Sequence, residues 1–227
     1  MITTTMNYAE IKSELDKDLK SVLNYVNKFS LDNKYRREAL KHTNRIWFKP
    51  VRWKSPHHNN YIILIESLGK SDFKKNGFVF YIFCYYFNNK NKLDVAMFTN
   101  MNDYVFYSGH LFERYAERFL NNKSMDKMDV IIKYFKSNRQ TAFHPFESSK
   151  YGNSIFGTTS DGVVLGNIIN GMGIFKTYIT FDMLRGEEVD YNVDNSSSLE
   201  ELKSVCNTKE FIQEMSLSLL CKVGYVA

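Results

Sequence analysis

The chain has 227 residues, of which 44% are hydrophobic and 24% charged, a composition typical of a folded protein with one large core or two small ones. Its densest apolar run, residues 78–87, is too short to cross a bilayer, and the polar first 14 residues lack the apolar core of a secretory signal. The three cysteines show neither disulfide-framework nor zinc-ribbon spacing. We therefore expect a soluble cytoplasmic protein and disfavour export or membrane insertion.

Charge is distributed unevenly along the chain, whose formal net charge is +5. Residues 1–54 carry 12 Lys and Arg against 6 Asp and Glu, whereas residues 186–227 carry 3 against 8. A basic end permits contact with nucleic acid, and Arg36, Arg37 and Lys41 are the candidate binding residues. The same polarity fits two ends that attract each other, a partner that covers one end, or ordinary solvated helix faces.

The first half of the chain predicts helices followed by strands. Apolar residues recur at helical spacing from Ile11 to Val26, Asp32 suits an N-cap, and Pro50 and Pro56 interrupt regular structure. Runs rich in β-branched and aromatic residues follow, separated by turn residues. In chain order, the expected elements are helices at 8–27 and 33–45, an irregular connector at 46–60, and strands at 61–67, 77–87, 92–99 and 104–107.

The second half predicts a helix pair, more strands and closing helices. Ser108 and Ser124 stand at plausible N-cap positions. The region around His144 and Pro145 has loop composition and suggests a mobile flap, in which His144 is a candidate second proton-transfer or binding group. In chain order, the expected elements are helices at 109–121 and 125–136, a loop at 138–153, strands at 154–159, 162–169 and 174–181, an acidic linker at 186–198, and helices within 199–227.

These elements define an α+β fold. It comprises N-terminal helices, an antiparallel β meander, a central helix pair, a second antiparallel strand set and C-terminal helices. The expected regions are 1–107, 108–185 and 186–227, which can also form one compact domain.

The helix predicted at 109–121 divides cleanly into a charged and an apolar face. At 100° per residue, His110, Glu113, Arg114, Glu117 and Arg118 fall within an arc of about 140°. One interpretation is a surface helix with intrahelical ion pairs. The other is a site, because an imidazole can transfer protons near neutral pH and guanidinium groups can hold a phosphate.

Three segments resemble a known family. They are SGHLFERYAERF at 108–119, GVVLG at 162–166 and FKTYIT at 175–180. Together, over roughly residues 108–185, they resemble the His-helix and C-terminal sheet of small bacterial proteins related to the RelE, colicin D and EndoU group of metal-independent ribonucleases. The resemblance implies His110 as acid or base, Arg114 and Arg118 as phosphate ligands, and Lys176, Thr177 and Tyr178 as helpers on a late strand.

No other motif indicates a metal or cofactor site. His57 and His58 have no carboxylate or cysteine at metal-ligand spacing, and residues 171–173 form a turn and not a dinucleotide fingerprint. We therefore expect no metal and no other cofactor.

The leading hypothesis is a metal-independent RNA-cleaving protein, such as a toxin or a product of a mobile element. RNA would be its substrate, and a protein partner or inhibitor is compatible with that role. One alternative is a noncatalytic module that binds nucleic acid or protein in phage–host conflict. A further alternative is a structural protein that assembles into oligomers through its aromatic strands.

Overall fold

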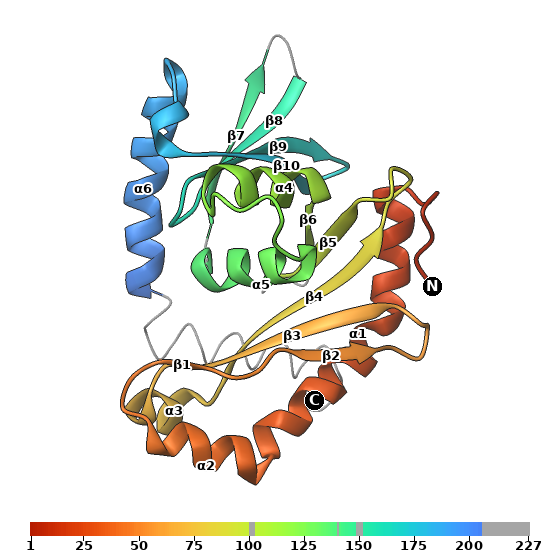
Figure 1. Ribbon diagram of the computed structural model, residues 1–227, viewed down its shortest axis with the longest axis vertical. Coiled ribbons are helices and arrows are strands. Elements are labelled where there is room, and N and C mark those ends of the chain that lie inside the picture. The colour runs from red at the N-terminus through yellow and green to blue at the C-terminus, as the bar shows by residue number, and fades with distance from the viewer. Residues whose placement is uncertain (100–102, 140, 149–151, 206–227) are drawn as a thin grey trace. The chain divides into compact units, whose positions relative to one another are not determined.

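The protein is an α+β protein that divides into two compact units. The computed structural model describes residues 1–99, 103–139, 141–148 and 152–205, and the two units are Met1–Tyr86 and Phe87–Val205. Figure 1 labels the helices and strands of each unit. Within the described ranges, no helix combines the length and apolarity needed to span a membrane.

Unit 1 (Met1–Tyr86) packs helices against an antiparallel sheet in which β3 is central. Strand β3 pairs with β1 and β2 on one side and with β4 on the other. Its elements are α1 (Tyr8–Leu31), α2 (Asn33–Lys41), β1 (Ile46–Trp47), β2 (Val51–Lys54), β3 (Asn60–Ser67), α3 (Lys70–Asn76) and β4 (Val79–Phe87), the last residue of which lies in unit 2.

Two local signals fix the helices of this unit. Helix α1 begins with a capping box, in which the Glu10 N–H donates to the Asn7 side chain and the Asn7 N–H donates to the Glu10 side chain. Asp32 caps α2, as predicted. The irregular connector predicted at 46–60 is wrong, because it contains β1, β2 and the start of β3. Pro50 and Pro56 flank β2 and leave its pairing intact.

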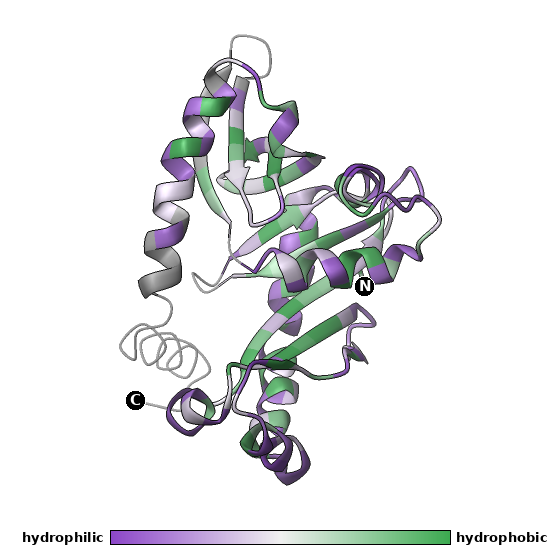
Figure 2. Ribbon diagram, turned by 60° about the vertical axis from the view of Figure 1, so that its left-hand side comes forward, coloured by the Kyte–Doolittle hydropathy of each residue, from purple (hydrophilic) through white to green (hydrophobic). Residues whose placement is uncertain are grey.

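The core of unit 1 lies between α1 and the sheet. Seven of the eight residues of β3 are buried, which is expected of a central strand covered on both faces. Helix α1 contributes Ile11, Leu15 and Val22 from one stripe. The strands are largely green in Figure 2, whereas the helices carry purple as well as green. The buried apolar residues of this unit therefore lie on the strands and on one face of α1.

Unit 2 (Phe87–Val205) is a six-stranded sheet in the order β5-β6-β10-β9-β8-β7, with β10 parallel to β6 and every other pair antiparallel. Strands β5 and β6 therefore belong with the late strands, whereas the sequence placed a boundary at 107/108. Its elements are β5 (Leu93–Phe98), β6 (Tyr104–Tyr107), α4 (Gly109–Arg118), α5 (Lys127–Ser137), β7 (Ala142–Ser148), β8 (Gly152–Thr158), β9 (Val163–Ile169), β10 (Met172–Ile179), the 3-10 helix Phe181–Met183 and α6 (Glu187–Val205).

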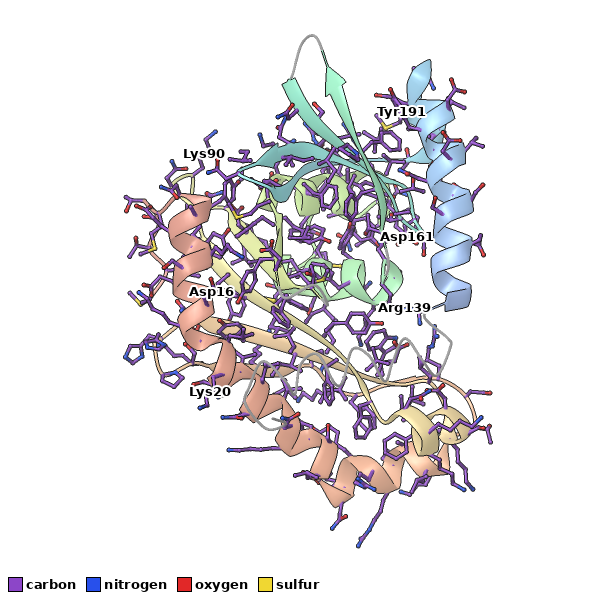
Figure 3. The ribbon with its side chains drawn as sticks, turned by 180° about the vertical axis from the view of Figure 1, so that it is seen from behind. Asp16, Lys20, Lys90, Arg139, Asp161 and Tyr191 are labelled. Carbon is purple, nitrogen blue, oxygen red and sulfur yellow. The ribbon has the colours of Figure 1, made fainter. Side chains whose placement is uncertain are left out.

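The helices of unit 2 cover opposite faces of its sheet. Helix α4 packs on β10 through Tyr115 and Tyr178, whose ring centroids lie 5.1 Å apart. Helix α6 packs on β8 from the other face, where the rings of Tyr191 and Phe156 lie 5.9 Å apart. Figure 3 labels Tyr191 on the side of α6 that faces the strands. Side chains on α4 and on the α6 face are therefore separated by the sheet.

Three predictions in unit 2 are wrong. The loop predicted at 138–153 contains β7 and the first residues of β8, and Pro145 is tolerated because β7 ends the strand order and needs no second partner. The acidic linker at 186–198 belongs to α6. Helix α5 is capped by Asp126 and not by Ser124. Residues 149–151, within the predicted flap, and residues 206–227 of the predicted closing helices lie outside the described part of the chain.

Candidate functional site

Hydrogen bonds fix the start of α4 to two strands of unit 2. Ser108 caps the helix, as predicted, and its hydroxyl also donates to the backbone oxygen of Lys176 on β10 at 2.8 Å. The Ser108 N–H donates to the Phe175 oxygen at 2.9 Å. The next N–H, of Gly109, donates to the buried Asp94 carboxylate on β5 at 2.7 Å. The first turn of the helix is therefore held in a defined place.

Glycine is required at position 109 because the backbone of α4 approaches the backbone of Leu93 closely there. A Cβ atom at Gly109 would lie 2.9 Å from the backbone oxygen of Leu93 and 2.9 Å from Cβ of Lys92. The backbone oxygen cannot move aside as a flexible side chain can. This approach places the base of the Lys92 side chain next to the first turn of α4.

We expect Ser108→Ala to lower the free energy of unfolding of unit 2 by about 1 kcal/mol, the usual cost of losing an N-cap. The substitution removes both the cap to Leu111 N–H and the bond to the Lys176 oxygen. Urea denaturation measures the change. Ser124→Ala is the matched control, because within the described part of the chain the Ser124 hydroxyl bonds Asn122 and caps no helix. Equal effects of both changes would contradict the anchoring role.

His110 lies at the centre of a charged cluster on the exposed face of α4. Its side chain is 42% exposed, and its Nδ1 lies 3.6 Å from Oε2 of Glu113. Its Nε2 accepts from Nε of Arg114 at 3.4 Å. This arrangement fits a neutral imidazole with its proton on Nδ1 and a basic lone pair on Nε2. Histidine, carboxylate and guanidinium thus meet within one helical turn.

Lys92 brings a second cation to this cluster. Its Nζ lies 2.5 Å from Oε2 of Glu113, the same oxygen that faces His110. Burial raises the pKa of Glu113, but the hydrogen bond and charge of Lys92, together with His110, outweigh burial and lower it. Glu113 is therefore an anion that holds Lys92 and His110 close together. The sequence analysis missed Lys92, for which the contact across 21 residues left no local signal.

The two arginines of α4 have different surroundings. Arg114 pairs with Glu117 at 2.7 Å through Nη1, while its Nε reaches His110. Arg118 turns toward the sheet, where its Nη1 donates to the backbone oxygen of Tyr178 at 2.5 Å. Arg114 thus lies beside the imidazole, whereas Arg118 helps to hold α4 on β10.

Tyr178 of β10 is fully buried and serves packing. Its ring packs against Tyr115, and its hydroxyl donates to the backbone oxygen of Asp161 at 2.5 Å. Burial, followed by the nearby Asp161 charge, raises the pKa of the Tyr178 hydroxyl. The structure therefore places this phenol beneath α4 and away from the exposed imidazole.

Lys176 and Thr177 lie at a bulge in β10. The register with β9 shifts between Phe175 and Thr177, which leaves Lys176 as the extra residue. Thr177 pairs with Leu165, which packs in the cluster on the α6 face, and Lys176 Nζ donates to Asn167 at 2.6 Å. Asn167 shares the face of Leu165 because it lies two residues further along β9. Both side chains thus lie on the face opposite α4, and the structure does not bring them to His110.

The predicted binding residues belong to other parts of the chain. Arg36, Arg37 and Lys41 are exposed on α2 of unit 1. Lys41 pairs with Glu38 at 2.8 Å. His144 is on β7 in unit 2, and its side chain lies outside the described residues.

Unit 1 contains a second polar cluster that the sequence analysis missed. The Asp18 carboxylate on α1 is fully buried and receives four hydrogen bonds or contacts from the β2–β3 hairpin. Ser55 donates at 2.6 Å, Asn59 at 2.7 Å and Tyr61 at 3.3 Å. His57 Nδ1 lies 2.7 Å from the other carboxylate oxygen. The cluster fastens the hairpin turn to α1.

One sequence signal could have found Asp18. It falls at helical spacing between Leu15 and Val22 on the apolar face of α1, where a carboxylate must find buried partners. Its partner His57 is 39 residues away and 47% exposed, so no local pattern joins them. The pair orients an imidazole, but the Ser55 hydroxyl bonds the carboxylate and not the ring, unlike a nucleophilic triad.

Comparison with known proteins identifies no relative. No family model matches the chain, and neither the curated proteins nor the solved structures contain a match. No group of three or more His, Cys, Asp or Glu side chains within the described ranges is placed to hold a metal ion. The geometry around His110 is therefore the main indication of function.

Proposed function

We propose that this protein is a metal-independent ribonuclease in which His110 transfers the proton during phosphodiester cleavage. The observation that carries the proposal is the cluster on α4, where a half-exposed imidazole lies 3.4 Å from Arg114 and shares Glu113 with Lys92. A basic nitrogen beside two cations suits a reaction that removes a proton next to a phosphate.

The reaction begins with attack of the RNA 2′-hydroxyl oxygen on the adjacent phosphorus. His110 Nε2 accepts the hydroxyl proton, the new O–P bond forms, and the bond to the 5′-oxygen breaks. The 5′-oxygen gains a proton, from the imidazolium or from water. The products are a 2′,3′-cyclic phosphate and a 5′-hydroxyl end.

The cations have separate tasks in this proposal. Arg114 binds the phosphate and, in doing so, releases the Nε2 atom to which its Nε now donates. Lys92 stabilises the charge that develops on the phosphate oxygens. Glu113 keeps the imidazole proton on Nδ1, which leaves Nε2 as the base.

RNA cleavage in the presence of excess EDTA tests the proposal. We expect single-stranded RNA to be cut, with fragments that carry 2′,3′-cyclic phosphate and 5′-hydroxyl ends in mass spectra. RNAs with 2′-deoxy substitution at the cut position should resist, because they lack the attacking hydroxyl. Cleavage that EDTA abolishes, or the absence of cleavage over a varied RNA pool, would overturn the proposal.

A second candidate function is RNA binding through α2. Four cations, Lys34, Arg36, Arg37 and Lys41, are exposed on this short helix, and a cluster of this kind contributes salt-dependent affinity for phosphates. Replacing Arg36, Arg37 and Lys41 together with alanine should weaken RNA binding and reduce the slope of log K against log salt by about 2 for single strands. Fluorescence anisotropy at several salt concentrations measures both quantities.

The matched control for α2 lies on another helix of the same unit. Lys70, Lys74 and Lys75 are exposed on α3, so their triple alanine variant loses the same charge. Equal losses of affinity in the two variants would show that net charge, and not α2, governs binding.

A further inference from the structure

A cavity of about 340 Å³ opens between α4 and α5, next to the His110 cluster. Its lining includes apolar side chains from both helices, among them Phe112 and Ala116 of α4 and Val130 and Ile131 of α5. This volume is at the lower end of the range for small-molecule sites, about 300–1,000 Å³. A flat ring of the size of a nucleobase fits such a space.

The cavity has a polar rim of carboxylates and lysines. Glu113 and Glu117 of α4 line it, together with Lys123 and Lys127. Glu117 is held by Arg114 at 2.7 Å and by Lys123 at 2.6 Å. Both contacts of Glu113 use Oε2, so Oε1 accepts no hydrogen bond from the described residues. The Glu113 carboxylate, which lines the cavity, therefore has acceptor capacity to spare.

Glu113 joins the cavity to the proposed active site. The same carboxylate lines the cavity and lies 3.6 Å from Nδ1 of His110. A nucleotide whose base occupies the cavity would therefore have its phosphate near His110 and Arg114.

We propose that this cavity binds the base of an RNA nucleotide beside the scissile phosphate, and that Glu113 selects bases with an exocyclic amino group. The inference rests on the proposed ribonuclease function, which places the scissile phosphate beside the cavity. Adenine, guanine and cytosine each offer an amino group to a carboxylate acceptor, as in the contacts of Asp or Glu with cytosine in nucleic-acid complexes. At the position of the cytosine amino group uracil presents a carbonyl oxygen, which a carboxylate repels.

Binding of the four nucleoside 3′-monophosphates tests this selection without any cleavage step. Isothermal titration calorimetry with the full chain should give dissociation constants for 3′-AMP, 3′-GMP and 3′-CMP at least about tenfold below that for 3′-UMP, the effect of one charged hydrogen bond. Glu113→Gln should reduce this discrimination, because an amide can donate to uracil. Ala116→Leu should weaken binding of all four by filling the cavity.

Two controls keep the result interpretable. Glu38→Gln alters a partly exposed helical glutamate that also pairs with a lysine and a histidine, and it should match the wild type. The melting temperature of Ala116→Leu shows whether the variant folds, and Glu113→Gln tests the inference independently of it.

The possible results separate the two proposals. Equal binding of the four nucleotides, or unchanged discrimination in Glu113→Gln, would overturn base selection, and EDTA-resistant RNA cleavage alongside it would leave the ribonuclease proposal standing. Selective nucleotide binding without any RNA cleavage would support the cavity as a base site and overturn the ribonuclease proposal.

Discussion

His110→Ala is expected to lower the rate of RNA cleavage by about 10²- to 10⁴-fold, the usual contribution of a general acid or base. The imidazole is the proposed proton-transfer group on the exposed face of α4, and alanine retains helical propensity at this position. Single-turnover measurements with saturating enzyme should show the loss in the chemical step, while RNA affinity changes little. Circular dichroism should show an unchanged fold.

His42→Ala is a close control for this change. His42 lies beside Glu38 at the end of α2, and its side chain is 45% exposed against 42% for His110. Both are helix-associated histidines paired with a carboxylate, but only His110 adjoins an arginine that donates to its ring. If His42→Ala reduced cleavage as much as His110→Ala did, the assignment of His110 would fail.

Asp18→Ala is expected to lower the free energy of unfolding of unit 1 by about 3 kcal/mol, because it leaves buried polar partners unsatisfied. Asn59 and Ser55 are themselves buried and donate to the carboxylate. Without it, the turn loses its attachment to α1. Chemical denaturation followed by the fluorescence of Trp53, on β2 next to this turn, reports on the correct unit.

Asp16→Ala is the matched control on the same helix. Asp16 is exposed, is labelled on α1 in Figure 3, and should change stability by less than about 0.5 kcal/mol. A similar small effect of Asp18→Ala would show that the buried cluster is not a stabilising contact.

The Asp18 effect should also depend on pH. Burial raises the pKa of this carboxyl, but hydrogen bonds from Ser55, Asn59 and His57 outweigh burial and hold the pKa below its ordinary value of 3.8. A carboxyl with a lowered pKa in the folded state stabilises the protein fully above the unfolded value. The difference between wild type and Asp18→Ala should therefore shrink as pH falls below 3.8 toward the lower pKa of the folded protein.

The sequence predicted those features that depend on neighbours along the chain. The α+β class and α4 follow from local periodicity and capping. The same periodicity predicts burial of Leu111, Phe112, Tyr115 and Phe119. The first three are buried, but Phe119 is 40% exposed because the helix ends at Arg118 and Phe119 is its C-cap. The juxtaposition of His110 and Arg114 also follows from helical spacing, because the two residues are one turn apart.

Features that depend on contacts between residues far apart in the sequence were not predictable in this way. Without the bulge in β10, Lys176 would share the face of Tyr178, two residues along the strand. The single inserted residue places it on the opposite face. Strand β7 was missed because Pro145 implies a loop unless the strand is known to be at the edge. The interaction of Asp18 with His57 joins a helix and a turn, which only the folded unit brings together.

The attachment of α4 to β10 has a consequence for the order of folding. Ser108 and its β10 partner Lys176 are 68 residues apart, so the bond between them closes a long loop. Contacts of such sequence separation form late, because the entropy of loop closure must be lost first. A nascent chain released before Met172–Ile179 would carry His110 on a helix without its strand anchor. Anchoring of the helix that carries the His110 cluster is therefore coupled to synthesis of β10, and a polypeptide that lacks this strand should be inactive.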